Sequence, residues 1–173
     1  AAYVMMAWRV AYFKVFYPLA YYCAYYSIRA NAFDYEKMAM GRERLEYYIN
    51  DYKAKKADGT ISNVEDDELK DMRIVQEMYA RGFEFVPIDI YKAKARSFQI
   101  IDGKIMPSFK VISKVGESAG ESIEIAARDG EFLSKDDLRQ RAKIGQTVIE
   151  KLGELGLLDG MAESNQLSLF DVI

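Results

Sequence analysis

The chain has 173 residues, with 24 Lys and Arg against 27 Asp and Glu, one cysteine and no histidine. Without histidine it cannot form a Ser-His-Asp or Cys-His catalytic site or a His-bearing zinc site, and one cysteine provides neither a four-thiolate zinc site nor an internal disulfide. The net charge of −3 does not by itself indicate nucleic-acid binding, and half of the residues are hydrophobic, which indicates a folded chain. A single cysteine suits a reducing compartment, so we expect a cytoplasmic protein. The opening Ala-Ala-Tyr-Val lacks an initiator methionine, and we expect a piece of a longer protein.

The first 30 residues carry three basic residues and no acid. Their longest uncharged run, 15–28, has 14 residues and is interrupted by Pro18, so it is shorter than the about 20 apolar residues of a membrane-spanning helix, and we expect no membrane partner. Residues 2–16 suit a helix that is apolar nearly all round, and Pro18 suits the first turn of a second helix that ends near Arg29. We therefore expect a buried, aromatic-rich helical pair inside a larger protein. Four of its tyrosines have an i, i+4 spacing that favours a place in the core over a base-stacking surface: Tyr21, Tyr22, Tyr25 and Tyr26.

The next segment predicts two further helices. Asp34 suits the N-cap of a long polar helix over 35–56. Residues 57–66 are typical of an exposed loop. Residues 67–81 are amphipathic and predict a helix that ends at Gly82.

After these helices the pattern changes to short elements. Residues 83–91 show a broken alternation that predicts extended structure, although a proline within them argues against a central strand. Apolar runs at 98–101 and 104–106 flank Asp102-Gly103, which predicts a β-hairpin with a type I′ turn. Residues 109–160 predict short helices punctuated by glycines.

An internal repeat with an offset of 29 residues carries the strongest functional signal. Both copies have a lysine, a β-branched apolar residue, a glycine, Glu or Gln, and Ser or Thr: Lys114-Val115-Gly116-Glu117-Ser118 and Lys143-Ile144-Gly145-Gln146-Thr147. In each copy we expect the glycine to end a tight hairpin and open a helix, and the preceding apolar residue to anchor the hairpin in the core. Free backbone N–H groups at such a turn can hold a phosphate, with the lysine beside it. The alternative is an ordinary helix–turn–helix packing unit.

The segment between the copies predicts the start of a further helix. Ser134 and Asp137 resemble a capping box, and Leu133 and Leu138 have the spacing of a hydrophobic staple. We therefore expect each copy to form a helix, a hairpin and a second helix. The repeat resembles the tandem helix-hairpin-helix motif of DNA-binding proteins, which implies contact with the duplex backbone. Lysine replaces the first glycine of the family pattern in both copies, and because lysine tolerates a left-handed backbone poorly, this predicts hairpins of different shape or weaker grip.

The end of the chain carries a second motif. It looks like the pentapeptide with which bacterial proteins bind the sliding clamp, in which two apolar side chains enter a pocket and a glutamine makes fixed hydrogen bonds: Gln166-Leu167-Ser168-Leu169-Phe170. The alternative is a tail that docks on its own domain.

The chain as a whole resembles the bacterial DNA polymerase III alpha subunits, and the order of hairpins followed by the clamp motif is that of the PolC type. The N-terminal part looks like the end of the polymerase fingers, on the residues Ala2-Tyr3-Val4-Met5-Met6-Ala7-Trp8-Arg9-Val10-Ala11-Tyr12-Phe13-Lys14 and Tyr17-Pro18-Leu19-Ala20-Tyr21-Tyr22. The resemblance implies a mainly α fold in three parts. These are a helical fingers segment over 1–95 with a small β-hairpin after it, a duplex-binding tandem helix-hairpin-helix domain over 96–160, and a flexible tail over 161–173.

The resemblance also implies a nucleotidyltransferase, a replicative DNA-directed DNA polymerase that uses Mg²⁺ held by palm aspartates. We find no paired aspartates in a strand context, because 66–68 and 136–137 suit solvated helix starts. We therefore expect no catalytic or metal-binding residue and no cofactor here, and a fragment that is inactive alone. The expected partners are primer–template DNA, the sliding clamp and the remaining polymerase domains. One of Arg9 and Lys14 could meet a template or nucleotide phosphate, although solvent and a carboxylate are equally good partners. Two other classes remain open, a DNA-repair or ligase-type module with a clamp tag, and a structural helical domain.

Overall fold

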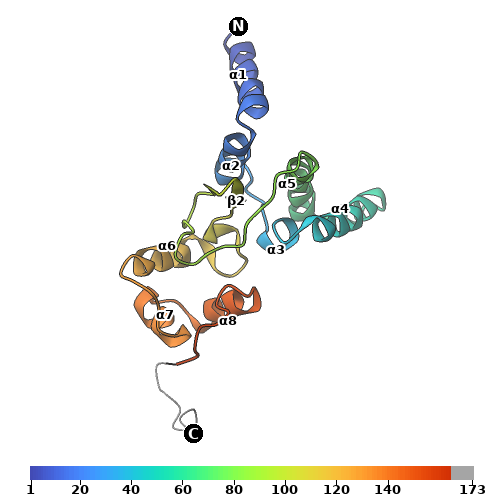
Figure 1. The fold of residues 1–173 in the computed structure, drawn as a ribbon. Coiled ribbons are helices and arrows are strands. Elements are labelled where there is room, and N and C mark those ends of the chain that lie inside the picture. The colour runs from blue at the N-terminus through green and yellow to red at the C-terminus, as the bar shows by residue number, and fades with distance from the viewer. Residues whose placement is uncertain (165–173) are drawn as a thin grey trace.

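The computed structural model describes residues 1–164, which form a mainly helical fold with one small antiparallel hairpin. The helices and strands are α1 (Ala2–Phe16), α2 (Pro18–Ile28), α3 (Tyr35–Met38), α4 (Arg42–Ala57), α5 (Asn63–Ala80), β1 (Gln99–Ile101), β2 (Lys104–Met106), the 3₁₀ helix η1 (Phe109–Val111), α6 (Gly116–Ala127), α7 (Lys135–Ala142) and α8 (Gln146–Glu154). The predicted fold class is confirmed. Helix α1 lies at one end of the molecule and α7 and α8 at the other (Figure 1).

Helix α1 forms where the sequence predicts it, but the expectation that it is buried is wrong for this chain. It has no buried residue, and Trp8 keeps 63% of its surface exposed. The reason is geometric, because α1 projects beyond the rest of the fold and only its last turns lie near other elements (Figure 1). No helix of the described residues is both long enough and apolar enough to cross a membrane.

Helix α2 supplies the tyrosine core that its spacing predicts. Pro18 occupies its first turn, and the side chains of Tyr22 and Tyr26 are fully buried, whereas Tyr21 and Tyr25 are half-buried. The Tyr26 ring contacts aromatic rings from three later segments: Phe33, Phe85 and Phe98. Aromatic pairs at these separations add to the hydrophobic stabilisation of burial. Helix α2 therefore joins the two halves of the chain.

The two predicted helices that follow differ from the prediction, the first by a break near its start and the second by an earlier start. Asp34 does cap a helix, by accepting a hydrogen bond from the Lys37 N–H at 3.0 Å, but that helix ends at Met38. Gly41, with φ of +109°, breaks the predicted helix before α4 begins. Helix α5 begins at Asn63, earlier than predicted, because Ser62 and Glu65 form a reciprocal capping box. It ends before Gly82, as predicted.

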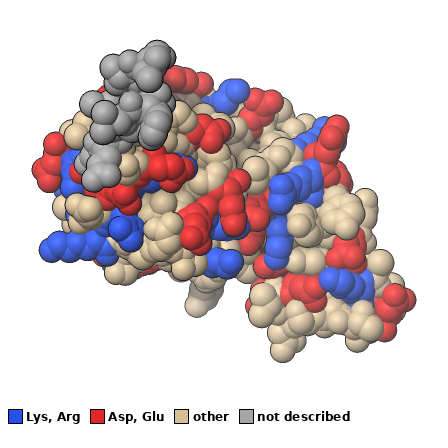
Figure 2. All heavy atoms as spheres, turned by 90° about the horizontal axis from the view of Figure 1, so that it is seen from below, with Lys and Arg blue, Asp and Glu red and all other residues tan. Residues whose placement is uncertain are grey.

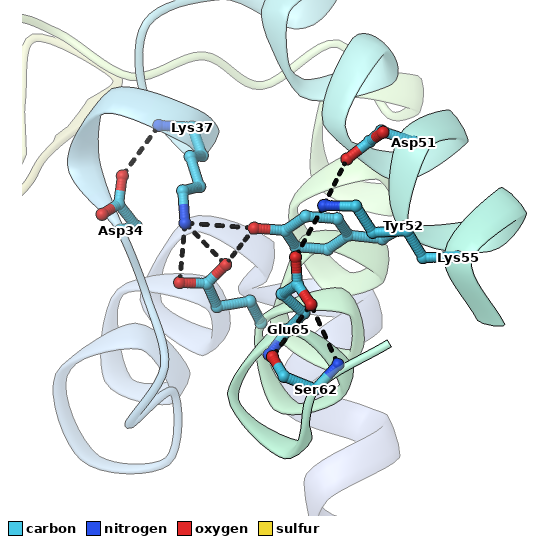
Figure 3. A network of polar contacts seen from close by, with 8 residues as sticks. Asp34, Lys37, Asp51, Tyr52, Lys55, Ser62 and Glu65 are labelled. Atoms are coloured by element: carbon cyan, nitrogen blue, oxygen red, sulfur yellow. Dashed lines mark hydrogen bonds and ion pairs between the residues drawn. The ribbon is translucent and has the colours of Figure 1, made fainter. Parts of the chain in front are cut away.

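A buried polar cluster ties α3, α4 and α5 together (Figure 3). Lys37 Nζ lies 2.7 Å from Glu68 Oε2 and 3.1 Å from Tyr52 OH, which in turn donates to Glu68 Oε2 at 2.5 Å. Glu68 is buried, so its expected place at a solvated helix start is wrong. Burial and the hydrogen bond to Glu68 raise the pKa of Tyr52 to about 12. Removal of either charged partner would leave the other buried without compensation.

The predicted hairpin is confirmed. Strands β1 and β2 pair antiparallel, and both turn residues have positive φ, 50° at Asp102 and 76° at Gly103, as a type I′ turn requires. The segment before it makes only one bridge to the sheet, between Phe85 and Ile105. One continuous hydrophobic core then runs from α2 through the hairpin to α8.

Polar contacts also connect the C-terminal helices to the N-terminal ones. Ser27 Oγ accepts a hydrogen bond from the Phe98 N–H at 2.8 Å, and the Ser27 carbonyl accepts one from Lys110 Nζ at 2.7 Å. Lys151 of α8 forms an ion pair with Glu36 of α3. The repeat is thus held on the same core as the helices that precede it.

Candidate nucleic-acid interface

The second copy of the repeat is a hairpin between two helices, as predicted. Helix α7 ends at Ala142, and its C-cap is Lys143, whose φ of 52° is left-handed and whose N–H donates to the Arg139 carbonyl. The Ile144 side chain is buried, and Gly145 is the N-cap of α8 in an extended conformation, with φ of −74°. The first two amides of α8, those of Gln146 and Thr147, have no hydrogen-bond partner within the described part of the chain.

The first copy has the same turn but a different entry. Its first element is the short 3₁₀ helix η1, so the expectation of a full helix before this hairpin is wrong. Lys114 is left-handed with φ of 68°, like Lys143, and Val115 is buried. Gly116 has φ of 72° and begins α6, whereas its counterpart Gly145 is extended. The two hairpins therefore differ in shape at the glycine.

Despite this difference, the two copies share one pattern of exposure. The lysine, the glycine and the two residues after it are exposed in both copies, and the apolar residue between lysine and glycine is buried. The exposed members are Lys114, Gly116, Glu117, Ser118, Lys143, Gly145, Gln146 and Thr147. The buried pair, Val115 and Ile144, anchors each turn, so the lysine, the glycine and the two residues after it face solvent together.

The two hairpin lysines are also distinguished by their charge environment. Neither Lys114 nor Lys143 forms an ion pair or a side-chain hydrogen bond within residues 1–164. Among the other Lys and Arg residues between 96 and 160, Lys110 donates to a backbone carbonyl and the rest form ion pairs. The face of the molecule seen in Figure 2 carries interspersed acidic and basic groups rather than one broad basic area. Among the Lys and Arg residues between 96 and 160, the two hairpin lysines are therefore those whose side chains have no partner within the described residues.

The segment between the two copies is fixed by an arginine whose role the sequence pattern did not predict. Arg141 donates hydrogen bonds to the carbonyls of Ala126, Gly130 and Glu131, at 2.7, 3.1 and 2.9 Å, and its guanidinium lies 4.5 Å from the centre of the Phe132 ring. These contacts close the loop between α6 and α7. They join residues that are 10 to 15 positions apart in the sequence, and no short sequence motif predicts them.

The start of α7 only partly follows the prediction. Ser134 Oγ accepts a hydrogen bond from the Asp137 N–H at 3.0 Å, as in a capping box, but Asp137 Oδ2 accepts from the N–H of Leu133. Leu138 is buried, whereas Leu133 is 75% exposed, so the predicted hydrophobic staple is not formed. The cap is therefore made by polar groups alone.

Arg9 and Lys14 do not lie with the hairpins. Lys14 Nζ lies 2.7 Å from Glu77 Oε1 and 5.4 Å from the centre of the Tyr21 ring. Although partial burial of Glu77 opposes the effect, hydrogen bonds from Lys14 and Tyr22 lower the pKa of Glu77. Arg9 lies beside an apolar groove between α1 and α2, at the end of the molecule opposite α7 and α8.

Two further predictions concern the clamp motif and metal binding. The clamp motif, Gln166-Leu167-Ser168-Leu169-Phe170, lies outside the described residues. Within residues 1–164, no group of three or more Asp, Glu or Cys side chains could hold a metal ion.

Comparison with known proteins connects this interface to a family. A family model described as a helix-hairpin-helix motif matches residues 82–167. The chain is 47% identical over 171 residues to the "DNA polymerase III PolC-type" of Streptococcus suis (strain 98HAH33). It is 46% identical to the proteins of the same name from Streptococcus pyogenes serotype M2 and Streptococcus pneumoniae serotype 2. Each match covers 99% of this chain and 12% of the relative, so the chain spans about an eighth of the length of these proteins.

The geometry and the comparisons agree on the region that carries the motif. The family match contains both hairpins and the loop that Arg141 closes. It begins at Gly82, directly after α5. The resemblance that the sequence suggested is therefore confirmed: the chain is homologous along nearly its whole length to a segment of PolC-type DNA polymerase III, and it carries a helix-hairpin-helix motif.

Proposed function

We propose that this chain is the C-terminal part of a replicative DNA polymerase, and that its two hairpins hold the sugar–phosphate backbone of the primer–template duplex. Residues 1–95 complete the fingers, residues 96–160 form the duplex-binding domain, and residues 161–173 carry the clamp motif. The proposal is supported most by one observation, the shared exposure of the lysine, the glycine and the first helix residues after it at both hairpins.

The chemistry of each hairpin suits a phosphate. The first amides of a helix point outward and carry partial positive charge, so they can donate to phosphate oxygens without a basic patch. The side chains of Lys114 and Lys143 stand at the same turns and are not committed to carboxylates. Because neither group contacts a base edge, the binding should not depend on DNA sequence.

The polymerase activity itself belongs to the proposal for the parent protein. DNA-directed synthesis would use Mg²⁺ held by carboxylates in other domains, and this chain would supply duplex contact rather than chemistry. Neither Arg9 nor Lys14 lies near the hairpins, so any contact of theirs with template or nucleotide phosphate would be a separate one in the fingers.

A salt titration of duplex affinity tests the proposal. The complete chain should bind unrelated duplexes equally, and the logarithm of the affinity should fall with the logarithm of salt concentration with a slope of about −2, because two lysines take part. Fluorescence anisotropy with two duplexes of different sequence measures both quantities. A slope several times steeper, a sequence preference or the absence of binding would contradict the proposal. Absence of binding would favour a structural helical domain.

Clamp docking is the second part of the proposed function, and it is supported by the motif at 166–170. We expect the double substitution Leu169→Ala and Phe170→Ala to abolish binding to a sliding clamp, because both apolar anchors are lost. The same variant should keep its duplex affinity, which serves as the control. Clamp affinity that is unchanged in calorimetry would remove this part of the proposal. Clamp docking would not by itself separate a polymerase from a repair-type module with a clamp tag.

A further inference from the structure

The two hairpins differ in charge at one equivalent position. Directly after the hairpin glycine, the second copy has the neutral Gln146 and the first copy has Glu117. Glu117 is in the first turn of α6, beside the amides that we propose for phosphate. A carboxylate there repels a phosphate, so the first hairpin needs a compensating charge that the second does not.

Arg96 supplies a positive charge next to Glu117. Its Nη2 lies 2.8 Å from Glu117 Oε1 and 2.7 Å from Glu121 Oε1, and its Nε donates to Glu121 at 3.0 Å. In the second copy, no arginine or lysine within residues 1–164 forms a side-chain hydrogen bond with Gln146, which stands in the place of Glu117. The copy with the acid has the arginine, and the copy without the acid lacks it.

Arg96 is held over α6 by contacts that do not involve its own side chain. The Ala95 N–H donates to Glu124 Oε2 at 2.9 Å, and Lys94 Nζ lies 3.2 Å from Glu124 Oε1. Gly120 allows the segment to approach closely, because a Cβ there would lie 3.4 Å from Ala95 Cα and 2.7 Å from the Cβ of Phe109. These contacts of the neighbouring residues thus place the Arg96 guanidinium beside the first turns of α6.

The ion pairs themselves contribute little to folding. The side chains of Arg96, Glu117 and Glu121 are 63%, 48% and 46% exposed. Exposed pairs of this kind stabilise proteins only slightly. A role in stability therefore does not account well for an arginine that contacts two carboxylates at this hairpin.

We propose that Arg96 is a positioning residue of the first hairpin, where it pairs with Glu117 and Glu121, offsets part of their negative charge and so makes the turn compatible with a DNA phosphate. This inference rests on the proposed function. It assigns to the first hairpin a second cation, from outside the repeat, and it explains how an acidic helix start can serve as a phosphate site.

Duplex affinity of the complete chain tests the inference. Arg96→Gln should weaken binding about fivefold at low salt, as expected for a charge interaction at an exposed site. Adding Glu117→Gln to that variant should restore affinity to within about twofold, because the repelling charge nearest the hairpin glycine is then gone. The matched control is Arg128→Gln, which removes an equally exposed arginine paired with Glu124 on the same helix and should leave affinity unchanged.

The converse variant is Gln146→Glu, which places an uncompensated acid in the second hairpin and should also weaken binding about fivefold. Thermal unfolding of all variants should stay close to that of the unsubstituted chain. Arg96→Gln with unchanged affinity, or weakened affinity that Glu117→Gln does not restore, would overturn the inference and leave the proposed function standing. If the unsubstituted chain bound no duplex, the proposed function would fail, and the inference with it.

Discussion

Lys114 and Lys143 adopt a backbone conformation that usually belongs to glycine. Both have positive φ, in the left-handed region where a side chain costs about 1–2 kcal/mol. The same conformation places a charged side chain, which forms no ion pair within residues 1–164, at the exposed turn of each hairpin. Under the proposed function, lysine here exchanges some stability for attraction to phosphate. It does not prevent the turn from forming.

Substitution of Lys143 by glycine separates these two effects. Lys143→Gly should raise the free energy of unfolding by about 1 kcal/mol, because the strain is relieved, and it should weaken duplex binding, because the charge is lost. Urea unfolding and anisotropy measure the two quantities. Lys143→Gln is the matched control, since it loses the charge and keeps the strained backbone, so it should weaken binding without the gain in stability. A glycine variant no more stable than the glutamine variant would show that the turn is not strained.

At the scale of elements, the contact between residues 94–96 and α6 determines where the first hairpin lies. Glu124 accepts the backbone hydrogen bond from Ala95 and pairs with Lys94 and Arg128. The hydrogen bond from Ala95, with help from both cations, lowers the pKa of Glu124 below its ordinary value of 4.5, although partial burial opposes this.

The lowered pKa predicts how this contact depends on pH. A carboxyl group whose pKa is lower in the folded state contributes stability above its unfolded value, here about pH 4.5, and loses that contribution as the pH falls through the folded value. Glu124→Gln should therefore be about 1 kcal/mol less stable than the unsubstituted chain at pH 7. The gap should close as the pH falls from about 5 to 3. Urea unfolding across this range measures it, with Glu150→Gln, at an exposed position, as the control. A gap that does not change with pH would contradict the assignment.

The elements that sequence could predict are those fixed by their own residues. The turn at Asp102-Gly103 and the stop at Gly82 follow from local backbone chemistry, and both are confirmed. The break at Gly41 was missed because one glycine inside a helical pattern is usually tolerated. The early start of α5 was missed although Ser62 and Glu65 carry the capping-box spacing that signals it.

In the candidate site, too, some features follow from local sequence and others do not. The repeat places its ten residues on two hairpins with matching exposure, so local pattern located the candidate site. The contacts of Arg96 and Arg141 join segments that are not neighbours in the helical pattern, and such contacts depend on how elements pack. The short helix η1 likewise follows from close packing on α6 at Gly120, not from its own sequence.

For the whole molecule, the two halves are joined by a shared core. Tyr26 of α2 packs on Phe98, and Lys151 of α8 pairs with Glu36 of α3. Binding experiments therefore need the complete chain, since a piece that begins at residue 96 would lose part of its core. The exposed apolar surface of α1 lies at the end of the molecule opposite α7 and α8, so it should not interfere with such measurements directly (Figure 1).

The central claim is that the hairpins hold DNA through backbone amides, and one substitution removes such an amide without changing charge. Gln146 is the first residue of α8 and follows an extended residue, so proline fits its backbone. Gln146→Pro should weaken duplex binding about tenfold, equally for unrelated sequences, because one hydrogen bond to a charged phosphate is lost. Gln146→Ala, which keeps the amide, should bind like the unsubstituted chain. Equal affinities of the proline and alanine variants, with both folded, would contradict the claim.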